Sequence, residues 1–243
     1  AASDVYKRQD KKKALIEDDF LVAEQHLSNQ LKAVPEPTVY PRTTGKDGQL
    51  IATPKNDWTE GFYPGCLWYI YEHNREESWK QSAVKWTEAL EPMKKLTSHH
   101  DIGFLIYCSF GNGYRLTGKE EYKDVIIEAA NSLTTRFSEV TGCIKSWNYR
   151  KAWNGKDEWF YPVIIDNMMN LELLYFASKV TGDTRYAKIA TTHAETTAKN
   201  QLREDYSNYH VVDYDTLTGK VLHQATCQGF SDNSAWARGQ AWA

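Results

Sequence analysis

The fold is decided by residues 166–182, which read DNMMNLELLYFASKVTG. Apolar side chains recur there at helical spacing, and the glycine of the Thr181-Gly182 pair stands where a helix commonly ends. A second helical pattern follows directly, with Tyr186 and Ile189 on one face. The stretch therefore predicts a hairpin of two helices.

The same arrangement occurs once more, earlier in the chain. Residues 101–118 read DIGFLIYCSFGNGYRLTG, and their Thr-Gly pair lies 64 residues before the later one, as Tyr122 does before Tyr186. Residues 58–86 fit an earlier, looser copy, and Asp232 is expected to open another helix. Because repeated hairpins stack to share one core, we predict an all-α toroid of helical hairpins.

The remaining segments fit around these hairpins. Residues 10–34 predict an amphipathic helix with Ile16, Phe20 and Leu27 on its apolar face, and prolines end it. Residues 35–57 read as loop or short extended segments, and helices are expected at 64–73 and 79–93. Long connections at 138–161 and 203–230 follow, and the second reads as two short strands around a glycine turn.

Composition excludes several classes of protein. The net charge is only -3 with both signs mixed along the chain, so no nucleic-acid partner is expected, and no apolar stretch is long enough to cross a membrane. Nine Trp and fifteen Tyr suit a protein that stacks on sugars. The four cysteines form no CxxC pair and are expected to be buried thiols, so neither a metal nor a cofactor is predicted. The oligomeric state stays open.

Two aspartates are the candidate catalytic groups. Asp166 lies in an apolar run, residues 161–169, that reads as the start of a buried helix, and Asp101 stands in a similar place. Burial raises the pKa of a carboxyl group and makes it a candidate proton donor near neutral pH. The alternative is that each aspartate simply caps the N-terminus of its helix. The pair suggests acid/base chemistry on a sugar.

Both ends of the chain look artificial. Residues 1–9 resemble a translated sequencing adapter, which we exclude from fold reasoning, and residues 236–243 stop in mid-pattern. We expect residues 10–243 to form one partial domain of a longer protein.

Five segments in order resemble glycoside hydrolase family 88, the unsaturated glucuronyl hydrolases. They are WTEGFYPGCLW at 58–68, HDIGF at 100–104, IDNMMN at 165–170, YH at 209–210, and QGFSDNSAWARGQAW at 228–242. The resemblance implies an (α/α)6 barrel, incomplete here because about eight helices are expected. It also implies a substrate, an oligosaccharide that ends in a 4,5-unsaturated uronic acid left by a polysaccharide lyase.

The resemblance also implies roles for residues. Asp166 matches the acid/base that protonates C4 of the enol ether, water adds at C5, and the hemiketal then breaks down. Asp101 matches a second carboxylate that stays ionised. The residues that match substrate contacts are Trp58, His210, Gln228, Trp236, Arg238 and Trp242. Trp147 or Trp153 is a further candidate to line the site. Apart from the resemblance, His100 is a candidate to orient Asp101, and His99 is expected to be exposed.

Other readings stay open. The three tryptophans could be core residues, His210 a surface loop residue, and Arg238 a helix-face charge paired with Asp232. A sister enzyme acting on unsaturated galacturonyl-rhamnose, a sugar-binding helical module and an inactive fragment are the alternative functions. The compartment is expected to be the bacterial periplasm or cytoplasm.

Overall fold

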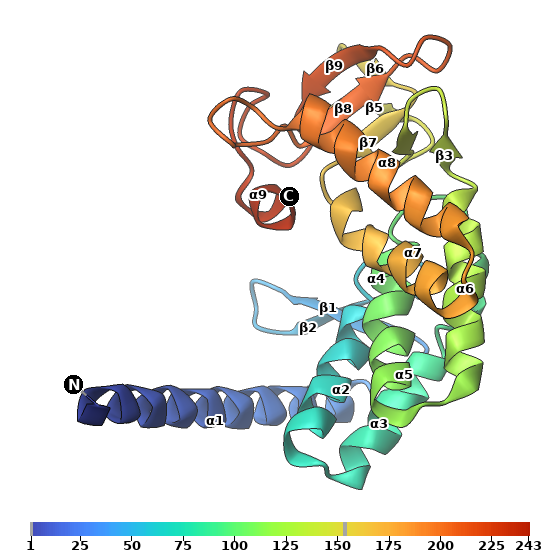
Figure 1. Cartoon of the computed structure of the whole chain (residues 1–243). Coiled ribbons are helices and arrows are strands. Elements are labelled where there is room, and N and C mark those ends of the chain that lie inside the picture. The colour runs from blue at the N-terminus through green and yellow to red at the C-terminus, as the bar shows by residue number, and fades with distance from the viewer. Residues whose placement is uncertain (1, 153–154) are drawn as a thin grey trace.

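Helical hairpins form most of the structure, a computed structural model that describes residues 2–152 and 155–243, with backbone alone for 2–10. The first helices of the three hairpins are α2 (Phe62–Asn74), a continuous helix made of α4 (Ile102–Ile106), η2 (Tyr107–Gly111) and α5 (Asn112–Thr117), and α7 (Asn167–Thr181). The second helices are α3 (Glu77–Glu88), α6 (Glu120–Thr134) and α8 (Thr184–Gln201), with a 3-10 turn η1 (Glu91–Lys95) after α3. Figure 1 shows the hairpins stacked side by side.

The repeat predicted from the sequence is confirmed in atomic detail. Gly118 and Gly182 both take the left-handed conformation, with φ of 67° and 76°, directly after their helices. The preceding threonine hydroxyls, of Thr117 and Thr181, donate to the carbonyl four residues earlier. Arg75 takes the same conformation after α2, with φ of 61°, so the looser first copy is confirmed too.

The first helices of neighbouring hairpins approach closely because glycine faces the next helix. A Cβ atom on Gly103 would lie 2.3 Å from Oδ1 of Asn170 on α7. A Cβ atom on Gly61 would lie 2.0 Å from the carbonyl oxygen of Phe104 on α4. Such contacts leave no room for a larger side chain at either glycine, so they restrict how α2, α4 and α7 can pack together.

One main hydrophobic core lies between the hairpins. Trp68, Trp86, Leu105, Tyr122 and Leu174 are among its fully or almost fully buried members. This core depends on contacts between hairpins, so the repeats stabilise one another.

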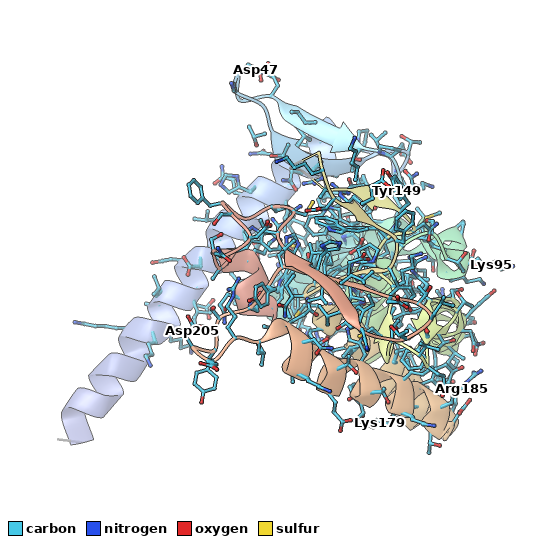
Figure 2. The ribbon with its side chains drawn as sticks, turned by 90° about the horizontal axis from the view of Figure 1, so that it is seen from above. Asp47, Lys95, Tyr149, Lys179, Arg185 and Asp205 are labelled. Carbon is cyan, nitrogen blue, oxygen red and sulfur yellow. The ribbon has the colours of Figure 1, made fainter. Side chains whose placement is uncertain are left out.

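Short antiparallel strands occupy the connections. β7 (Pro162–Ile164), β8 (Val211–Tyr214) and β9 (Val221–Ala225) form a three-stranded sheet beside α8. Three strand pairs accompany it: β1 (Tyr40–Thr44) with β2 (Leu50–Thr53), β3 (Phe137–Ser138) with β4 (Cys143–Ile144), and β5 (Arg150–Lys151) with β6 (Glu158–Trp159). The two strands predicted around a glycine turn are β8 and β9, and Gly219 has φ of 70°. Seen from above, Asp47 marks the far tip of the β1–β2 hairpin (Figure 2).

Several predicted boundaries are wrong. Helix α1 (Ala2–Ala33) starts before residue 10, and Ile16 on its predicted apolar face is 52% exposed. The run 161–169 is not all helix, because β7 pairs with β8 before Asp166 starts α7. No helix opens at Asp232. Its carboxylate accepts the backbone N–H of Thr226 at 2.8 Å, and α9 (Ala237–Trp242) begins five residues later.

The cysteines also differ from the prediction. Only Cys143 of the four is buried, while Cys66 is exposed and Cys108 and Cys227 are intermediate. A side chain faces the core or solvent according to its place in the folded chain, and the spacing between cysteines carries no such information. Among the described helices, none combines the length and apolarity that a membrane crossing requires.

Candidate active site

The two candidate aspartates lie at the starts of neighbouring helices, α4 and α7. The backbone N–H of Phe104 donates to Oδ1 of Asn170 at 2.9 Å, and Nδ2 of Asn170 donates to the carbonyl of Asp166 at 3.4 Å. Asn170 therefore joins the two helix starts. Neither Asp101 nor Asp166 makes a side-chain capping bond, so capping does not explain either residue.

Asp166 is a buried carboxyl group with a raised pKa. Only 7% of the residue is exposed, and Oδ2 makes no hydrogen bond within the described residues. Burial raises its pKa to about 7, the negative charge of Asp101 adds to this, and Arg238 opposes it. A carboxyl group of this kind holds a proton near neutral pH.

His210 faces Asp166 with a defined ring nitrogen. Its Nδ1 accepts the backbone N–H groups of Cys227 at 3.0 Å and Gln228 at 3.3 Å, so the proton of the neutral ring is on Nε2. That Nε2 lies 3.6 Å from Oδ2 of Asp166. Burial, helped by Arg238, lowers the pKa of His210 to about 3, which keeps the ring neutral. The residue is buried, so it is not a surface loop residue.

Asp101 has the opposite electrostatic character. Burial alone would raise its pKa, but the adjoining histidine rings outweigh that effect and hold the pKa below its usual value. Nε2 of His100 lies 3.2 Å from Oδ1, and Nδ1 of His99 lies 3.1 Å from Oδ2. His99 is thus half-buried against Asp101, and the prediction of an exposed side chain is wrong.

Three tryptophans form an aromatic group with one cation at its centre. Trp58 and Trp236 each meet the ring of Trp242 edge-on at 6.2 Å between centroids. The guanidinium of Arg238 lies 5.3 Å from the Trp58 ring, 4.4 Å from Trp236 and 5.2 Å from Trp242. All three rings are half-buried and lie outside the hydrophobic core clusters, which argues against plain core packing.

This aromatic group adjoins both aspartates. Trp236 stacks on His210, with 4.3 Å between ring centroids, and Trp242 lies 5.3 Å from Phe104, three residues after Asp101. Arg238 donates to Oε1 of Gln228 at 2.8 Å, so the two exposed polar candidates form a pair. Across the described residues, Arg238 forms no ion pair with Asp232.

The connection at 138–161 contains two further candidates, Trp147 and Trp153. Trp147 packs against a small cluster that includes Trp159 and Ile164, and the guanidinium of Arg150 lies 4.5 Å from its ring. Trp153 lies outside the described residues. Asn170 was missed as a linking residue, although it closes the IDNMMN segment that carried the resemblance.

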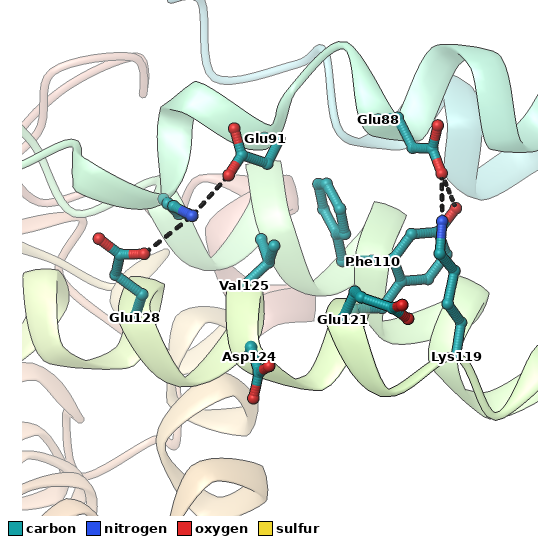
Figure 3. Close-up of a pocket in the computed structure, with 10 residues that line it drawn as sticks. Glu88, Glu91, Phe110, Lys119, Glu121, Asp124, Val125 and Glu128 are labelled. Atoms are coloured by element: carbon teal, nitrogen blue, oxygen red, sulfur yellow. Dashed lines mark hydrogen bonds and ion pairs between the residues drawn. The ribbon is translucent and has the colours of Figure 1, made fainter.

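A cavity of about 530 Å³ lies elsewhere, between α3, η1 and α6 (Figure 3). Glu88 pairs there with Lys119, and Glu91 and Glu128 pair with Lys94. None of its lining residues is a candidate site residue. Three of its acidic residues are paired with these lysines, and the cavity contains neither Asp101 nor Asp166, so we place the candidate chemistry at those two aspartates.

The family model described as Glycosyl Hydrolase Family 88 matches residues 34–243. The chain belongs to this family. An unsaturated glucuronyl hydrolase of Formosa agariphila is 48% identical over 206 residues, 84% of this chain and 50% of that protein. The family 88 chain thus spans about half the length of the curated relatives it matches.

Solved structures agree with this membership. The crystal structure of an unsaturated glucuronyl hydrolase specific for heparin matches the family 88 chain with a TM-score of 0.86 at 43% identity. The match covers 93% of this chain and 58% of that one. An aspartate-to-asparagine mutant of the Streptococcus agalactiae enzyme, complexed with dGlcA-GalNAc6S, matches with a TM-score of 0.73 at 31% identity, over 93% and 54% of the two chains.

Proposed function

We propose that the protein releases a 4,5-unsaturated uronic acid from the non-reducing end of oligosaccharides made by polysaccharide lyases. The proposal rests on one observation, that the pKa values of two neighbouring carboxyl groups are shifted in opposite directions. Burial raises the pKa of Asp166 to about 7, while the histidines beside Asp101 keep its pKa low. Such a pair supplies one proton donor and one lasting negative charge at the same pH.

The proposed reaction is hydration of the C4=C5 enol ether. The protonated carboxyl group of Asp166 gives its proton to C4, and positive charge develops at C5. Water then adds its hydroxyl group to C5 and returns its proton to Asp166, so one water molecule is consumed. The ionised Asp101 stabilises the positive charge. The resulting hemiketal opens by breaking the bond between C5 and the ring oxygen, which leaves a hemiacetal at C1. That hemiacetal breaks down to an aldehyde and releases the second sugar.

The aromatic group suits the substrate. The flat unsaturated ring can lie against Trp58, Trp236 and Trp242, and stacking on aromatic faces is a common mode of sugar binding. Arg238 and Gln228 are the polar groups proposed to bind the sugar, since a guanidinium can form paired bonds with a carboxylate. No cofactor takes part in the proposed reaction.

The relatives support the details of this proposal. Those named above are glucuronyl hydrolases, and one is complexed with an unsaturated disaccharide, which favours that class over the galacturonyl-rhamnose class. We propose that the whole protein closes an (α/α)6 barrel, of which these hairpins are a part. The bacterial periplasm or cytoplasm, where lyase products are consumed, is the proposed compartment.

Ultraviolet absorbance tests the proposal, because hydration removes the conjugated double bond. Unsaturated chondroitin, hyaluronan, heparin and pectin disaccharides are each incubated with the chain. The assay is repeated with the chain continued by the remaining residues of the Formosa agariphila relative, because the chain spans half of that protein. Loss of absorbance with a glycosaminoglycan disaccharide supports the proposal. No loss from either protein with any disaccharide would refute it, and affinity without turnover would indicate a sugar-binding module.

A further inference from the structure

Glu60 is a buried carboxyl group that the proposed chemistry does not use. It is 0% exposed and belongs to the turn between β2 and α2, two residues after Trp58. Its Oε1 accepts the backbone N–H of Asp57 at 2.7 Å, and its Oε2 makes no hydrogen bond within the described residues. Because the Glu60 side chain bonds the backbone three residues earlier in the same turn, it fixes the backbone on both sides of Trp58.

The turn is secured at its other end by Asp57. Oδ1 of Asp57 accepts the backbone N–H of Thr59 at 3.0 Å and its hydroxyl at 2.7 Å. The same oxygen lies 3.2 Å from Nε of Arg42, whose guanidinium lies 5.4 Å from the Trp58 ring. The backbone before Trp58 is therefore held by Glu60, and the backbone after it by Asp57.

This turn is also pressed against the helix that follows Asp101. Gly61 has no room for a Cβ atom beside the carbonyl of Phe104, and the Trp58 ring lies 6.1 Å from the Phe104 ring. A shift of the turn would therefore move the Trp58 ring relative to Asp101 and to Trp242, which it meets at 6.2 Å.

We propose that Glu60 is a positioning residue. It holds Trp58 in the aromatic group that is proposed to bind the sugar, and it does so through the Asp57–Glu60 turn. Glu60 touches no reacting atom and acts only through Trp58. Burial raises the pKa of Glu60 to about 7, so near neutral pH its carboxyl group is partly protonated. The inference rests on the proposed function, because it concerns the position of Trp58 in the proposed substrate site.

The test compares two replacements of similar length. Glu60→Gln keeps an oxygen that can accept the N–H of Asp57, whereas Glu60→Met removes it and leaves that partly buried N–H without its partner. We expect Glu60→Met to raise KM about tenfold with kcat within about threefold, since a displaced binding wall weakens binding more than chemistry. Glu60→Gln is expected to keep the wild-type KM. Glu77→Met, at an exposed glutamate on α3, is the matched control and should change neither constant.

A double-mutant cycle separates positioning from general stability. If Glu60 acts through Trp58, then Trp58→Ala and the Glu60→Met, Trp58→Ala double mutant should share one KM. Additive effects on KM, or a folded Glu60→Met with the wild-type KM, would overturn the inference. If Glu60→Met does not fold, Glu60→Gln still provides a test. A folded Glu60→Gln protein with a raised KM would overturn the inference, because this variant keeps the acceptor oxygen. An inactive wild-type protein would instead refute the proposed function, so the two failures are distinguishable.

Discussion

Nε2 of His210 lies 3.6 Å from Oδ2 of Asp166, and neither atom makes a hydrogen bond within the described part of the chain. Two backbone N–H groups hold the other ring nitrogen, so the proton on Nε2 is directed at the carboxyl group. A neutral imidazole adds no positive charge beside the buried acid, and its N–H can donate to the carboxylate that remains after the proton has left. Burial raises the pKa of Asp166 to about 7 and lowers the pKa of His210 to about 3, so Asp166, rather than His210, is the group that titrates near neutral pH.

Replacing the acid should abolish turnover and spare binding. Asp166→Asn keeps the shape of the side chain but cannot give a proton, so we expect kcat to fall at least about 10³-fold. Calorimetric titration with an unsaturated disaccharide should give a Kd within about threefold of wild type. An Asn variant that keeps even a tenth of the turnover would exclude Asp166 as the acid.

The pH profile should decline on the alkaline side near 7. Asp166 must hold its proton, and its protonated fraction falls as pH rises through the pKa of about 7. In Asp101→Asn the negative neighbour that raises this pKa is gone, so the decline of the residual activity should move to lower pH. A decline that stays in place in this variant would show that the two carboxyl groups are not coupled.

Stability should depend on pH through the same group. The pKa of Asp166 is raised in the folded state, so its folded form binds the proton more tightly. The contribution of Asp166 to stability is then greatest below the usual value of 3.8 and is lost as pH rises to about 7. Raising a pKa that far corresponds to about 4 kcal/mol. Urea unfolding should find Asp166→Asn more stable than wild type by up to this amount at pH 8 and about equally stable at pH 4. A gain that is the same at both pH values would contradict this.

His210 should have separable roles in folding and chemistry. An Asn side chain can place an oxygen near the position of Nδ1, so His210→Asn should keep the bonds from Cys227 and Gln228. His210→Ala leaves both N–H groups unpaired and should cost about 1–3 kcal/mol more, measured by urea unfolding. Both variants lose the donor beside Asp166 and should share a lowered kcat. Equal stability of the two would argue against the Nδ1 contacts.

Gly103 should be intolerant of one added methyl group. In Gly103→Ala the new Cβ would lie within 3 Å of Asn170, and α4 and α7 would have to separate. We expect a loss of about 1–3 kcal/mol from overpacking, together with reduced turnover because Asp101 moves away from Asp166. Ala198→Ser, an equally small addition at an exposed site on α8, should change neither the midpoint of unfolding nor kcat. A Gly103→Ala protein as stable and active as wild type would mean the helix contact is loose.

The sequence by itself determined the hairpin repeat. Helical periodicity and the Thr-Gly pairs at 117–118 and 181–182 are local signals, because a helix and its glycine end depend on residues within a few positions. The same locality identified Asp101 and Asp166, since each stands next to the helix it precedes. Both predictions depended on short-range pattern alone.

Only the tertiary structure decided which groups meet. Asp101 and Asp166 come together because Gly103 lets Asn170 approach α4 across 66 residues of chain. The carboxylate of Asp232 bonds the N–H of Thr226 and so replaces the predicted helix start with a turn. The protonated nitrogen of His210 is likewise fixed by backbone groups that follow β9. These outcomes depend on contacts between distant segments, whose geometry follows from packing and burial, and no local pattern encodes them.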